Sequence, residues 1–221
     1  MRRGRHRPPR IREQGTERVA LGARISRGFV RSPSMHVGNP QPVLDLGTPV
    51  ALLCTMEEDG SLHLAAVTSA WWMGPRCVLG LHDVSRASAN LRRTREVVVN
   101  MPAAGQAETV ARLIRVAGRA AVPDGGPERG YRCARDRIGI LGLTPVPSET
   151  VRPPRVSECP IQLEAVLDDV HAPAPGSPLP GDVAIFEVRV TRLHLDASVL
   201  ADGRPDRIDP DRWRPLIMGS P

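Results

Sequence analysis

Aromatic residues, lysine and long apolar runs are what this sequence has least of. Its 221 residues include only three Trp, two Phe and one Tyr, and all 30 basic residues are Arg. No stretch approaches the roughly 18 uncharged apolar residues that a membrane-spanning helix needs. The sequence therefore predicts no transmembrane helix and no membrane partner, while its apolar content of 41% is enough to bury a core.

The motifs of several enzyme classes are also absent. The sequence has no G-x-S-x-G, no H-E-x-x-H, no G-x-x-x-x-G-K-S/T and no G-x-G-x-x-G. Its six His residues include no pair at i, i+4, and its four Cys residues include no C-x-x-C. We therefore expect no catalytic side chain, no metal site and no disulfide scaffold, and a reducing cytoplasm suits such a chain.

The positive charge is confined to the first 34 residues. This stretch holds ten Arg against two acidic residues, a net charge of +8, whereas residues 35–221 hold twenty Arg against twenty-two acidic residues, a net charge of −2. An Arg-rich arm can bind nucleic acid, and it also resembles an organelle transit peptide. Three simpler explanations of this Arg-rich stretch are a disordered tail, an added extension, and a true translation start at Met35.

We expect residues 1–34 to be a disordered, dispensable extension, because their charge is segregated and their apolar content is low. Nucleic-acid binding is not expected, since the remaining chain is almost neutral. Residues 35–221 are predicted to form one domain.

Strand patterns dominate that domain. Residues 48–55 and 61–68 flank the turn E-E-D-G, which predicts a hairpin. Further strands are predicted at 76–82, 96–101, 161–171 and 182–195, and helices at 85–94, 106–116 and 127–140. Residues 144–160 contain five Pro, which predicts an extended connection. Together these elements predict a mainly β fold of the antiparallel type that closes into a barrel.

Hydroxyl-bearing residues stand at the ends of two of these elements. Thr68 and Ser69 end the second predicted strand. Ser85 and Ser88, together with Arg86, open the predicted helix at 85–94, which follows the third strand. A helix N-terminus with unpaired backbone N–H groups, hydroxyls and an Arg can bind a phosphate. Ordinary N-capping by Ser85 is the simpler alternative.

Trp71 and Trp72 place two of the six aromatic residues side by side, in the segment T-S-A-W-W-M-G. Adjacent residues of an extended segment point to opposite faces. One indole can therefore pack into the core while the other covers a pocket or a partner subunit. A planar, phosphorylated ligand would need both an apolar shelf and an anion site.

Five segments carry a resemblance to a known family. They are G-T-P-V-A-L-L-C-T with E-E-D-G, H-L-A-A-V-T-S-A-W-W-M-G, S-x-x-x-x-N-L-R-R-T-R-E-V-V-V-N-M-P, G-L-T-P-V-P-S-E-T-V-R-P-P-R-V-S-E-C-P-I-Q-L-E-A and I-D-P-D-R-W-R-P-L-I. In this order they resemble the flavin reductase-like, FMN-binding split-barrel proteins, in the branch with a Ser-Ala-Trp-Trp segment. The resemblance runs from about Met35 to Leu216.

The resemblance implies a six-stranded antiparallel split barrel that forms a homodimer with FMN at the subunit interface. The residues that it assigns to the cofactor are Thr68, Ser69 and Ala70 along the flavin, Trp71 and Trp72 beside the isoalloxazine or at the dimer seam, and Ser85, Arg86, Ser88 and Asn90 at the phosphate. Packing of both indoles in the core or interface is the alternative. The region around Trp213 would also need a surface to pack on.

The sequence departs from the family at three of these positions. His63 stands where Asn is usual, Ala66 where Pro is usual, and Ala87 where a phosphate-binding Thr is frequent. A lost hydroxyl contact to a charged group costs about 1.5–3 kcal/mol. We expect Arg86 or Ser88 to compensate for the missing hydroxyl at Ala87.

The resemblance implies an NAD(P)H-dependent flavin reductase, in which hydride passes from nicotinamide to flavin. Such chemistry is supplied by the cofactors, which agrees with the lack of a catalytic signature. The alternative is a non-catalytic protein that binds flavin or delivers it to a monooxygenase.

Overall fold

The computed structural model describes residues 47–117, 132–133, 137–172 and 183–218. The described strands are β1 (Thr48–Pro49), β2 (Ala51–Met56), β3 (Leu62–Val67), β4 (Ala70–Met73), β5 (Arg76–His82), β6 (Glu96–Met101), β7 (Val116–Ala117), β8 (Arg132–Cys133), β9 (Pro145–Val146), β10 (Arg155–Val156), β11 (Ile161–His171), β12 (Val183–Leu195), β13 (Leu200–Ala201), β14 (Arg204–Ile208) and β15 (Ile217–Met218). The helices are α1 (Arg86–Thr94), α2 (Ala107–Arg115), α3 (Arg137–Leu141) and the 3-10 turns η1 (Ala104–Gln106) and η2 (Ala197–Val199). The predicted extension 1–34 lies outside the described residues, as does most of the helix expected at 127–140.

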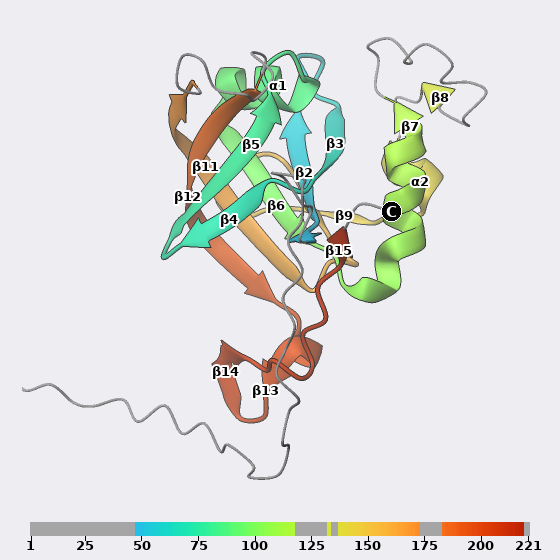
Figure 1. Ribbon diagram of the computed structural model, residues 1–221, viewed down its shortest axis with the longest axis vertical. Helices are drawn as coiled ribbons and strands as arrows, with labels where there is room; N and C mark the ends of the chain where they lie inside the picture. The colour runs from blue at the N-terminus through green and yellow to red at the C-terminus, as the bar shows by residue number, and fades with distance from the viewer. Residues whose placement is uncertain (1–46, 118–131, 134–136, 173–182, 219–221) are drawn as a thin grey trace, which may run out of the picture. The chain divides into compact units, whose positions relative to one another are not determined.

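One antiparallel sheet forms the body of the fold. Its seven strands follow the order β3-β2-β6-β11-β12-β5-β4, and the sheet curls on itself like an opened barrel (Figure 1). The prediction of a mainly β split barrel is therefore confirmed. Six of these strands are the predicted ones, and β4, which holds both neighbouring Trp residues, adds a seventh at one edge.

Two apolar clusters cover the two faces of this sheet. Alternate residues of β2 divide between them: Leu53 belongs to the first cluster, while Leu52 and Cys54 belong to the second. This division follows from the period of two in a strand. The second cluster also contains buried residues of α2 and α3, such as Val110 and Leu141. Strand β2 is thus buried on both faces of the sheet, and helices α2 and α3 cover one of these faces.

Helix α1 lies across one end of the sheet (Figure 1). Its N-cap is Ser85, whose Oγ accepts a hydrogen bond of 3.2 Å from the backbone N–H of Ser88. It ends at Arg95, which adopts the left-handed conformation with φ of 59° and donates its N–H to the Leu91 carbonyl. The sequence prediction of this helix and of its cap is confirmed.

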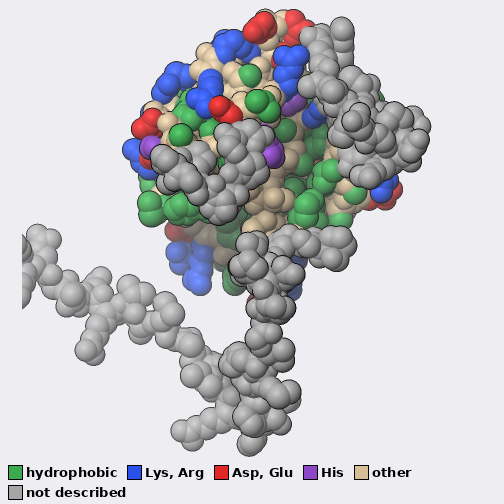
Figure 2. Space-filling view, turned by 45° about the horizontal axis from the view of Figure 1, so that its top comes forward, with side chains coloured by type: hydrophobic (Ala, Val, Ile, Leu, Met, Phe, Trp, Pro, Cys, Tyr) green, Lys and Arg blue, Asp and Glu red, His purple; other side chains and the backbone are tan. Residues whose placement is uncertain are grey.

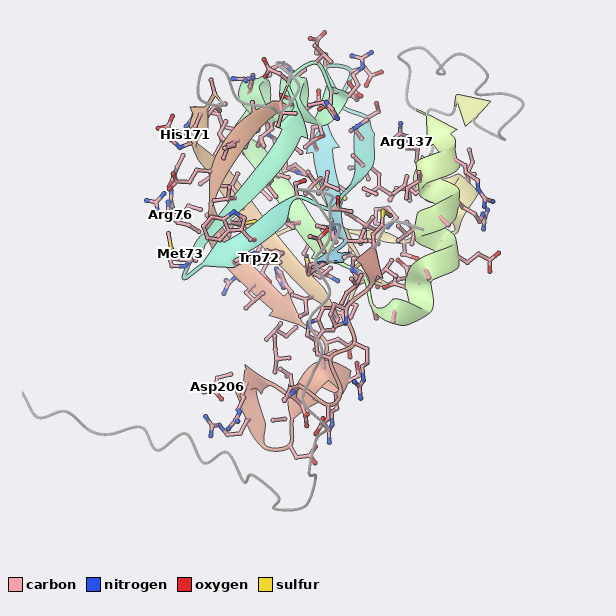
Figure 3. The ribbon with its side chains drawn as sticks, viewed as in Figure 1. Trp72, Met73, Arg76, Arg137, His171 and Asp206 are labelled. Carbon is pink, nitrogen blue, oxygen red and sulfur yellow. The ribbon has the colours of Figure 1, made fainter. Side chains whose placement is uncertain are left out.

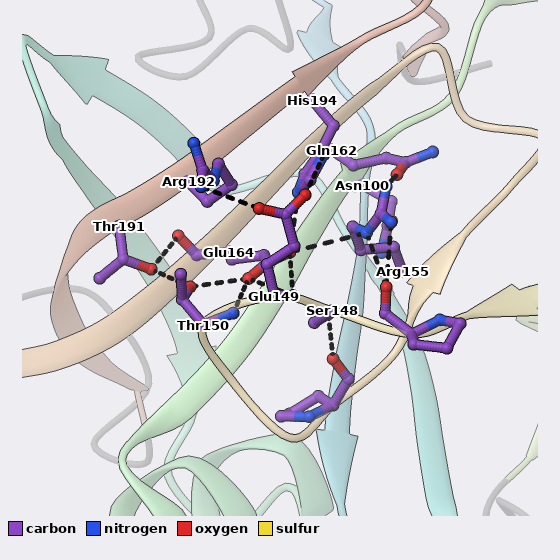
Figure 4. A network of polar contacts seen from close by, with 12 residues as sticks. Asn100, Ser148, Glu149, Thr150, Arg155, Gln162, Glu164, Thr191, Arg192 and His194 are labelled. Atoms are coloured by element: carbon purple, nitrogen blue, oxygen red, sulfur yellow. Dashed lines mark hydrogen bonds and ion pairs between the residues drawn. The ribbon is translucent and has the colours of Figure 1, made fainter.

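The proline-rich segment 144–160 is extended, as predicted, and it is fastened to the sheet by the buried carboxylate of Glu164 on β11 (Figure 4). Thr150 donates to Glu164 through both its N–H, at 2.6 Å, and its hydroxyl, at 2.7 Å. The N–H of Glu149 donates at 2.9 Å, and the His194 Nε2 lies 2.8 Å from the same carboxylate. One fully buried acid therefore fixes the course of a segment that has few backbone donors of its own.

These contacts also set the ionisation of Glu164. Burial raises its pKa, but the hydrogen bonds donated by the Thr150 hydroxyl, by the N–H groups of Glu149 and Thr150, and by His194 together lower it to about 2. The carboxylate is therefore charged throughout the physiological range.

No helix among the described residues is both long enough and apolar enough to span a membrane.

Candidate functional site

A pocket of about 590 Å³ opens between β3, β5 and the N-terminus of α1. Four of the residues predicted to bind the cofactor line it: Thr68, Ser69, Ser85 and Arg86. A volume in this range is typical of small-molecule and cofactor sites. The structure thus brings together the end of the second predicted strand and the start of the first predicted helix.

Gly80 on β5 allows this convergence. Its N–H donates a hydrogen bond of 2.8 Å to the Ser69 carbonyl. A Cβ atom at this position would lie only 2.9 Å from the Ser69 Cβ. Because no side chain stands in the way, the Thr68–Ser69 loop can press against β5 and reach the pocket.

The other five predicted residues do not line this pocket. Ala70 and Trp72 are partly buried against the first core cluster, whereas Trp71 is 53% exposed. Figure 3 shows Trp72 on the β4–β5 hairpin, well away from Arg137 of the pocket. The expected division of the two indoles between opposite faces of the strand is confirmed by their burial.

Ser88 and Asn90 are buried in α1, outside the pocket lining. The Asn90 side-chain amide donates to the Thr55 hydroxyl at 3.3 Å, which ties α1 to β2. The Ser88 Oγ is buried with no hydrogen-bond partner among the described residues. Of the two residues expected to compensate for the hydroxyl that Ala87 lacks, only Arg86 lines the pocket.

Positive charge dominates the pocket. Its lining includes the guanidinium groups of Arg86 and Arg137 and no carboxylate among the described residues. Glu57 stands just behind the lining, with carboxylate oxygens 3.7 Å from Arg86 and 3.4 Å from the Nδ1 of His63. Such a set of charges favours an anionic ligand.

His63 is a titratable group of the pocket wall. Burial lowers its pKa, and the guanidinium charges of Arg137 and Arg86 lower it further, to about 4. The imidazole is therefore neutral near pH 7 and offers one hydrogen-bond donor and one acceptor. His82 lines the same pocket.

Arg137 was not found from the sequence. It starts α3, far along the chain from the other lining residues, and it reaches the pocket because its Nη1 donates to the Leu64 carbonyl on β3. No local motif marks it. Only the packing of α3 against β3 shows that it belongs to the site.

The described cysteines are not candidates for nucleophiles. Cys54, Cys77 and Cys159 are buried, and none lines the pocket. Burial raises the pKa of the Cys77 and Cys159 thiols to about 12, so both remain protonated and unreactive. No cluster of three or more His, Cys, Asp or Glu suited to a metal occurs in the described part of the chain.

The residues present fit a phosphorylated ligand. The N-terminus of α1 supplies backbone N–H groups and the positive end of the helix dipole. Arg86 supplies a guanidinium for charge-assisted hydrogen bonds, and Thr68, Ser69 and His63 supply neutral donors and acceptors. The N-cap role of Ser85 is also confirmed.

Known proteins show similarity over most of the chain. The sequence model of the flavin reductase like domain matches residues 43–210. An uncharacterised protein of Bacillus subtilis, YdfE, is 33% identical over 175 residues, which cover 79% of this chain and 82% of that protein.

Solved structures share the fold at lower sequence identity. Flavoredoxin of Desulfovibrio vulgaris superposes with a TM-score of 0.64 and 20% identity over 84% of this chain and 88% of its own. Component B of nitrilotriacetate monooxygenase from Bacillus cereus superposes with a TM-score of 0.63 and 19% identity over 85% of this chain and 94% of its own.

Proposed function

Because the chain belongs to the flavin reductase-like family, which makes it a flavin-related oxidoreductase, we propose that it is an NAD(P)H-dependent flavin reductase that binds FMN in the pocket beside α1. The observation that carries the proposal is the convergence of Thr68, Ser69, Ser85 and Arg86 on one cationic pocket. The resemblance to the family assigns these same residues to the flavin and its phosphate.

The side chains of the pocket have binding roles in this proposal. Arg86 and the N-terminus of α1 hold the phosphate, while Thr68 and Ser69 offer backbone and hydroxyl contacts to the flavin ring. Neutral His63 accepts or donates a hydrogen bond without adding a charge. Bound FMN supplies the hydride-accepting chemistry, with NAD(P)H as the donor.

No catalytic side chain is required of this chain. Its contribution is to orient two rings and to exclude water, which is how proteins assist cofactor chemistry in general. Trp71 and Trp72 lie outside the pocket of the single chain, and we propose that they act at the seam of a homodimer. Ala70 holds the start of β4 in the same region.

A non-catalytic flavin carrier is the second candidate. It is favoured by the structural likeness to a protein named component B of a monooxygenase, which suggests a monooxygenase as partner. In that role the same pocket would bind flavin for transfer rather than for reduction by this chain.

Steady-state oxidation of NADH and NADPH by the purified full chain tests the proposal. We expect oxidation that depends on added FMN, FAD or riboflavin. Flavin binding without nicotinamide oxidation would support the carrier instead, and the absence of both activities would contradict the flavin assignment altogether.

A further inference from the structure

Strand β3 offers a free backbone edge to the pocket. Within the described part of the sheet it is the edge strand opposite β4, and it pairs only with β2. On β5, across the pocket, the Gly80 N–H donates to the Ser69 carbonyl and not to β3. The backbones of β3 and β5 therefore stay unpaired with each other, and the pocket lies between them, lined by residues of both strands.

The register of the β2–β3 hairpin shows which backbone groups of β3 point to this free edge. The Glu57 N–H donates to the Ser61 carbonyl at 2.8 Å, and the ladder continues from this pair without a bulge. In an antiparallel ladder, every second residue bonds the partner strand, and the residues between them point their N–H and C=O groups the other way. Counted from Ser61, Leu64 and Ala66 are among the residues of β3 that point away from β2.

The contacts of these two residues agree with this count. The Leu64 carbonyl accepts a hydrogen bond from the guanidinium of Arg137 on α3, as a group outside the ladder can. Ala66 lines the pocket, and no hydrogen bond described outside the β2–β3 ladder uses its N–H or its C=O. One backbone donor and one acceptor thus lie side by side at the pocket. The Pro that is usual here in the family would have no N–H, so the donor is a feature of this chain.

An unpaired N–H beside an unpaired C=O is what the edge of a sheet presents to a further strand. A ligand can take the place of that strand if it carries the complementary pair, a C=O beside an N–H, as cyclic imides and primary amides do. The isoalloxazine ring has such an edge, because its N3–H lies between two ring carbonyls. Thr68, which the proposed function assigns to the flavin ring, follows Ala66 by two residues and lines the same pocket.

We propose that the backbone of Ala66 binds the pyrimidine edge of the flavin ring, with its N–H donating to a ring carbonyl and its C=O accepting from N3–H. The inference rests on the proposed function, because it takes this pocket as the flavin site. It also orients the ring. The pyrimidine end lies against β3, while Arg86 and the N-terminus of α1 hold the phosphate.

Equilibrium binding to the purified full chain tests this contact without any turnover. Riboflavin, FMN and 3-methylriboflavin, in which a methyl group replaces the N3 hydrogen, are titrated by flavin fluorescence. NAD⁺ is titrated by calorimetry, because its carboxamide carries the same pair of groups as the flavin edge. Ala66→Pro removes the N–H at an edge position of the kind that tolerates proline. Ala66→Val is the matched control, because it keeps the N–H and adds a side chain of similar size.

Ala66→Pro should weaken the binding of riboflavin and of FMN by the same factor, roughly two- to ten-fold, because both contain the ring and each loses one neutral hydrogen bond. Its affinity for NAD⁺ should equal that of the wild type. Ala66→Val should change flavin affinity by less than about two-fold, since no hydrogen bond is lost. The wild-type chain should bind 3-methylriboflavin roughly five- to a hundred-fold more weakly than riboflavin, because the Ala66 carbonyl is left without its donor. This last comparison needs no variant, so it does not depend on how Ala66→Pro folds.

Four results would overturn the inference. The first is unchanged flavin affinity in Ala66→Pro, and the second is an equal loss in Ala66→Val, which would assign the effect to the side chain. The third is a wild-type chain that binds 3-methylriboflavin as tightly as riboflavin. The fourth is a loss in Ala66→Pro for NAD⁺ alone, which would assign the Ala66 backbone to the nicotinamide. A wild-type chain that binds neither riboflavin nor FMN would refute the proposed function itself, whereas in a chain that binds both, these four results concern Ala66 alone.

Discussion

Arg86 takes part in an ion pair of the fold and also lines the pocket. It opens α1, lies 3.7 Å from Glu57 and is 42% exposed at the pocket. The pair with Glu57 is a partly solvated ion pair, which by itself contributes little to stability. We therefore expect the position of Arg86 at a helix N-terminus to matter more for anion binding than for folding.

Arg86→Ala should weaken the binding of FMN far more than that of riboflavin, because riboflavin has no phosphate for Arg86 to contact. A charge-assisted contact of about 1.5–3 kcal/mol corresponds to roughly ten- to a hundred-fold in affinity. The difference should shrink as salt increases, since an exposed contact is screened. Paired titrations with FMN and riboflavin at low and high salt measure both effects.

Arg92→Ala is the control on the same helix, because Arg92 pairs with Asp83 and does not line the pocket. It should leave the ratio of FMN to riboflavin affinity unchanged. If Arg86→Ala weakened both ligands equally, Arg86 would support the fold and not the phosphate.

The contrast between Arg86 and Arg137 explains which site residues the sequence can reveal. Arg86 follows a capping Ser, so local chemistry marks it as part of a helix N-terminus. Arg137 reaches the pocket through a contact with β3, 73 residues away in sequence. Long-range contacts of this kind leave no local pattern, and Ser88, which local pattern favoured, points into the buried side of its helix.

Strands and helices were mostly predictable because their apolar periods are local. The order of the strands was not, since β2 pairs with β6 and β5 with β12 across long stretches of chain. Strand β4 was expected only as an extended segment. It becomes part of the sheet because Gly74, with φ of 60°, closes a tight turn that returns the chain along β5.

Gly80→Ala tests how closely the Thr68–Ser69 loop must approach β5. The added methyl group would lie 2.9 Å from the Ser69 Cβ, so the loop must move. We expect a loss of about 1–3 kcal/mol in the free energy of unfolding and several-fold weaker flavin binding. Urea unfolding and a flavin titration measure the two effects.

Gly105→Ala is the matched control, because nothing lies within 4 Å of a Cβ at Gly105. Its flavin affinity should equal that of the wild type. Unchanged flavin binding in Gly80→Ala would show that the close approach of the loop to β5 is not needed for the site.

Glu164→Gln tests the clamp on the proline-rich segment. The folded-state pKa of Glu164 is about 2, against an ordinary value of 4.5. A depressed pKa contributes stability that is present above pH 4.5 and is lost as the pH falls toward 2. The shift corresponds to about 3 kcal/mol at neutral pH. We expect Glu164→Gln to reduce the free energy of unfolding by an amount of this order at pH 7.

The difference in the free energy of unfolding between wild type and Glu164→Gln should narrow as the pH falls from 5 to 3. In this range the unfolded wild-type chain takes up a proton at Glu164, whereas the folded chain, with a pKa of about 2, does not. Urea unfolding at several pH values measures it. Glu158→Gln is the control, because Glu158 is an exposed acid that accepts a hydrogen bond from the Thr144 N–H. This variant should reduce the free energy of unfolding by at most about 1 kcal/mol. A constant difference at all pH values would assign the effect to packing.

At the scale of the whole molecule, charge separates the chain into two parts. Residues 1–34 carry +8 and residues 35–221 carry −2. A chain that starts at Met35 should keep its thermal stability and its flavin affinity, because every described contact of the pocket lies beyond that residue. Thermal melting and a flavin titration compare the two chains. Aggregation or lost flavin binding in the shorter chain would show that the first part supports the second.

The exposed edge of the sheet argues for a homodimer. Trp71 and Met73 are 53% and 65% exposed on β4, which pairs with β5 on one side only. Exposed aromatic side chains on an open strand edge are typical of an interaction surface.

Trp213, by contrast, packs against the core of its own chain, so it gives no reason to expect a partner. Figure 2 shows acidic and basic side chains interspersed over another part of the surface, as expected of a solvated face.

Trp71→Glu should therefore convert a dimer into a monomer, since it places a charge where the partner's apolar surface would lie and leaves the charge unpaired. Ile140→Glu is the control, because Ile140 is similarly exposed, at 48%, but lies on α3. Sedimentation of both variants and of the wild type at micromolar concentration measures the assembly. We expect Trp71→Glu to sediment as a monomer and to bind flavin more weakly, because the proposed site needs walls from two subunits.

A wild-type chain that is monomeric would contradict the dimer. A dimer that persists in Trp71→Glu but dissociates in Ile140→Glu would move the interface to the helical side of the sheet.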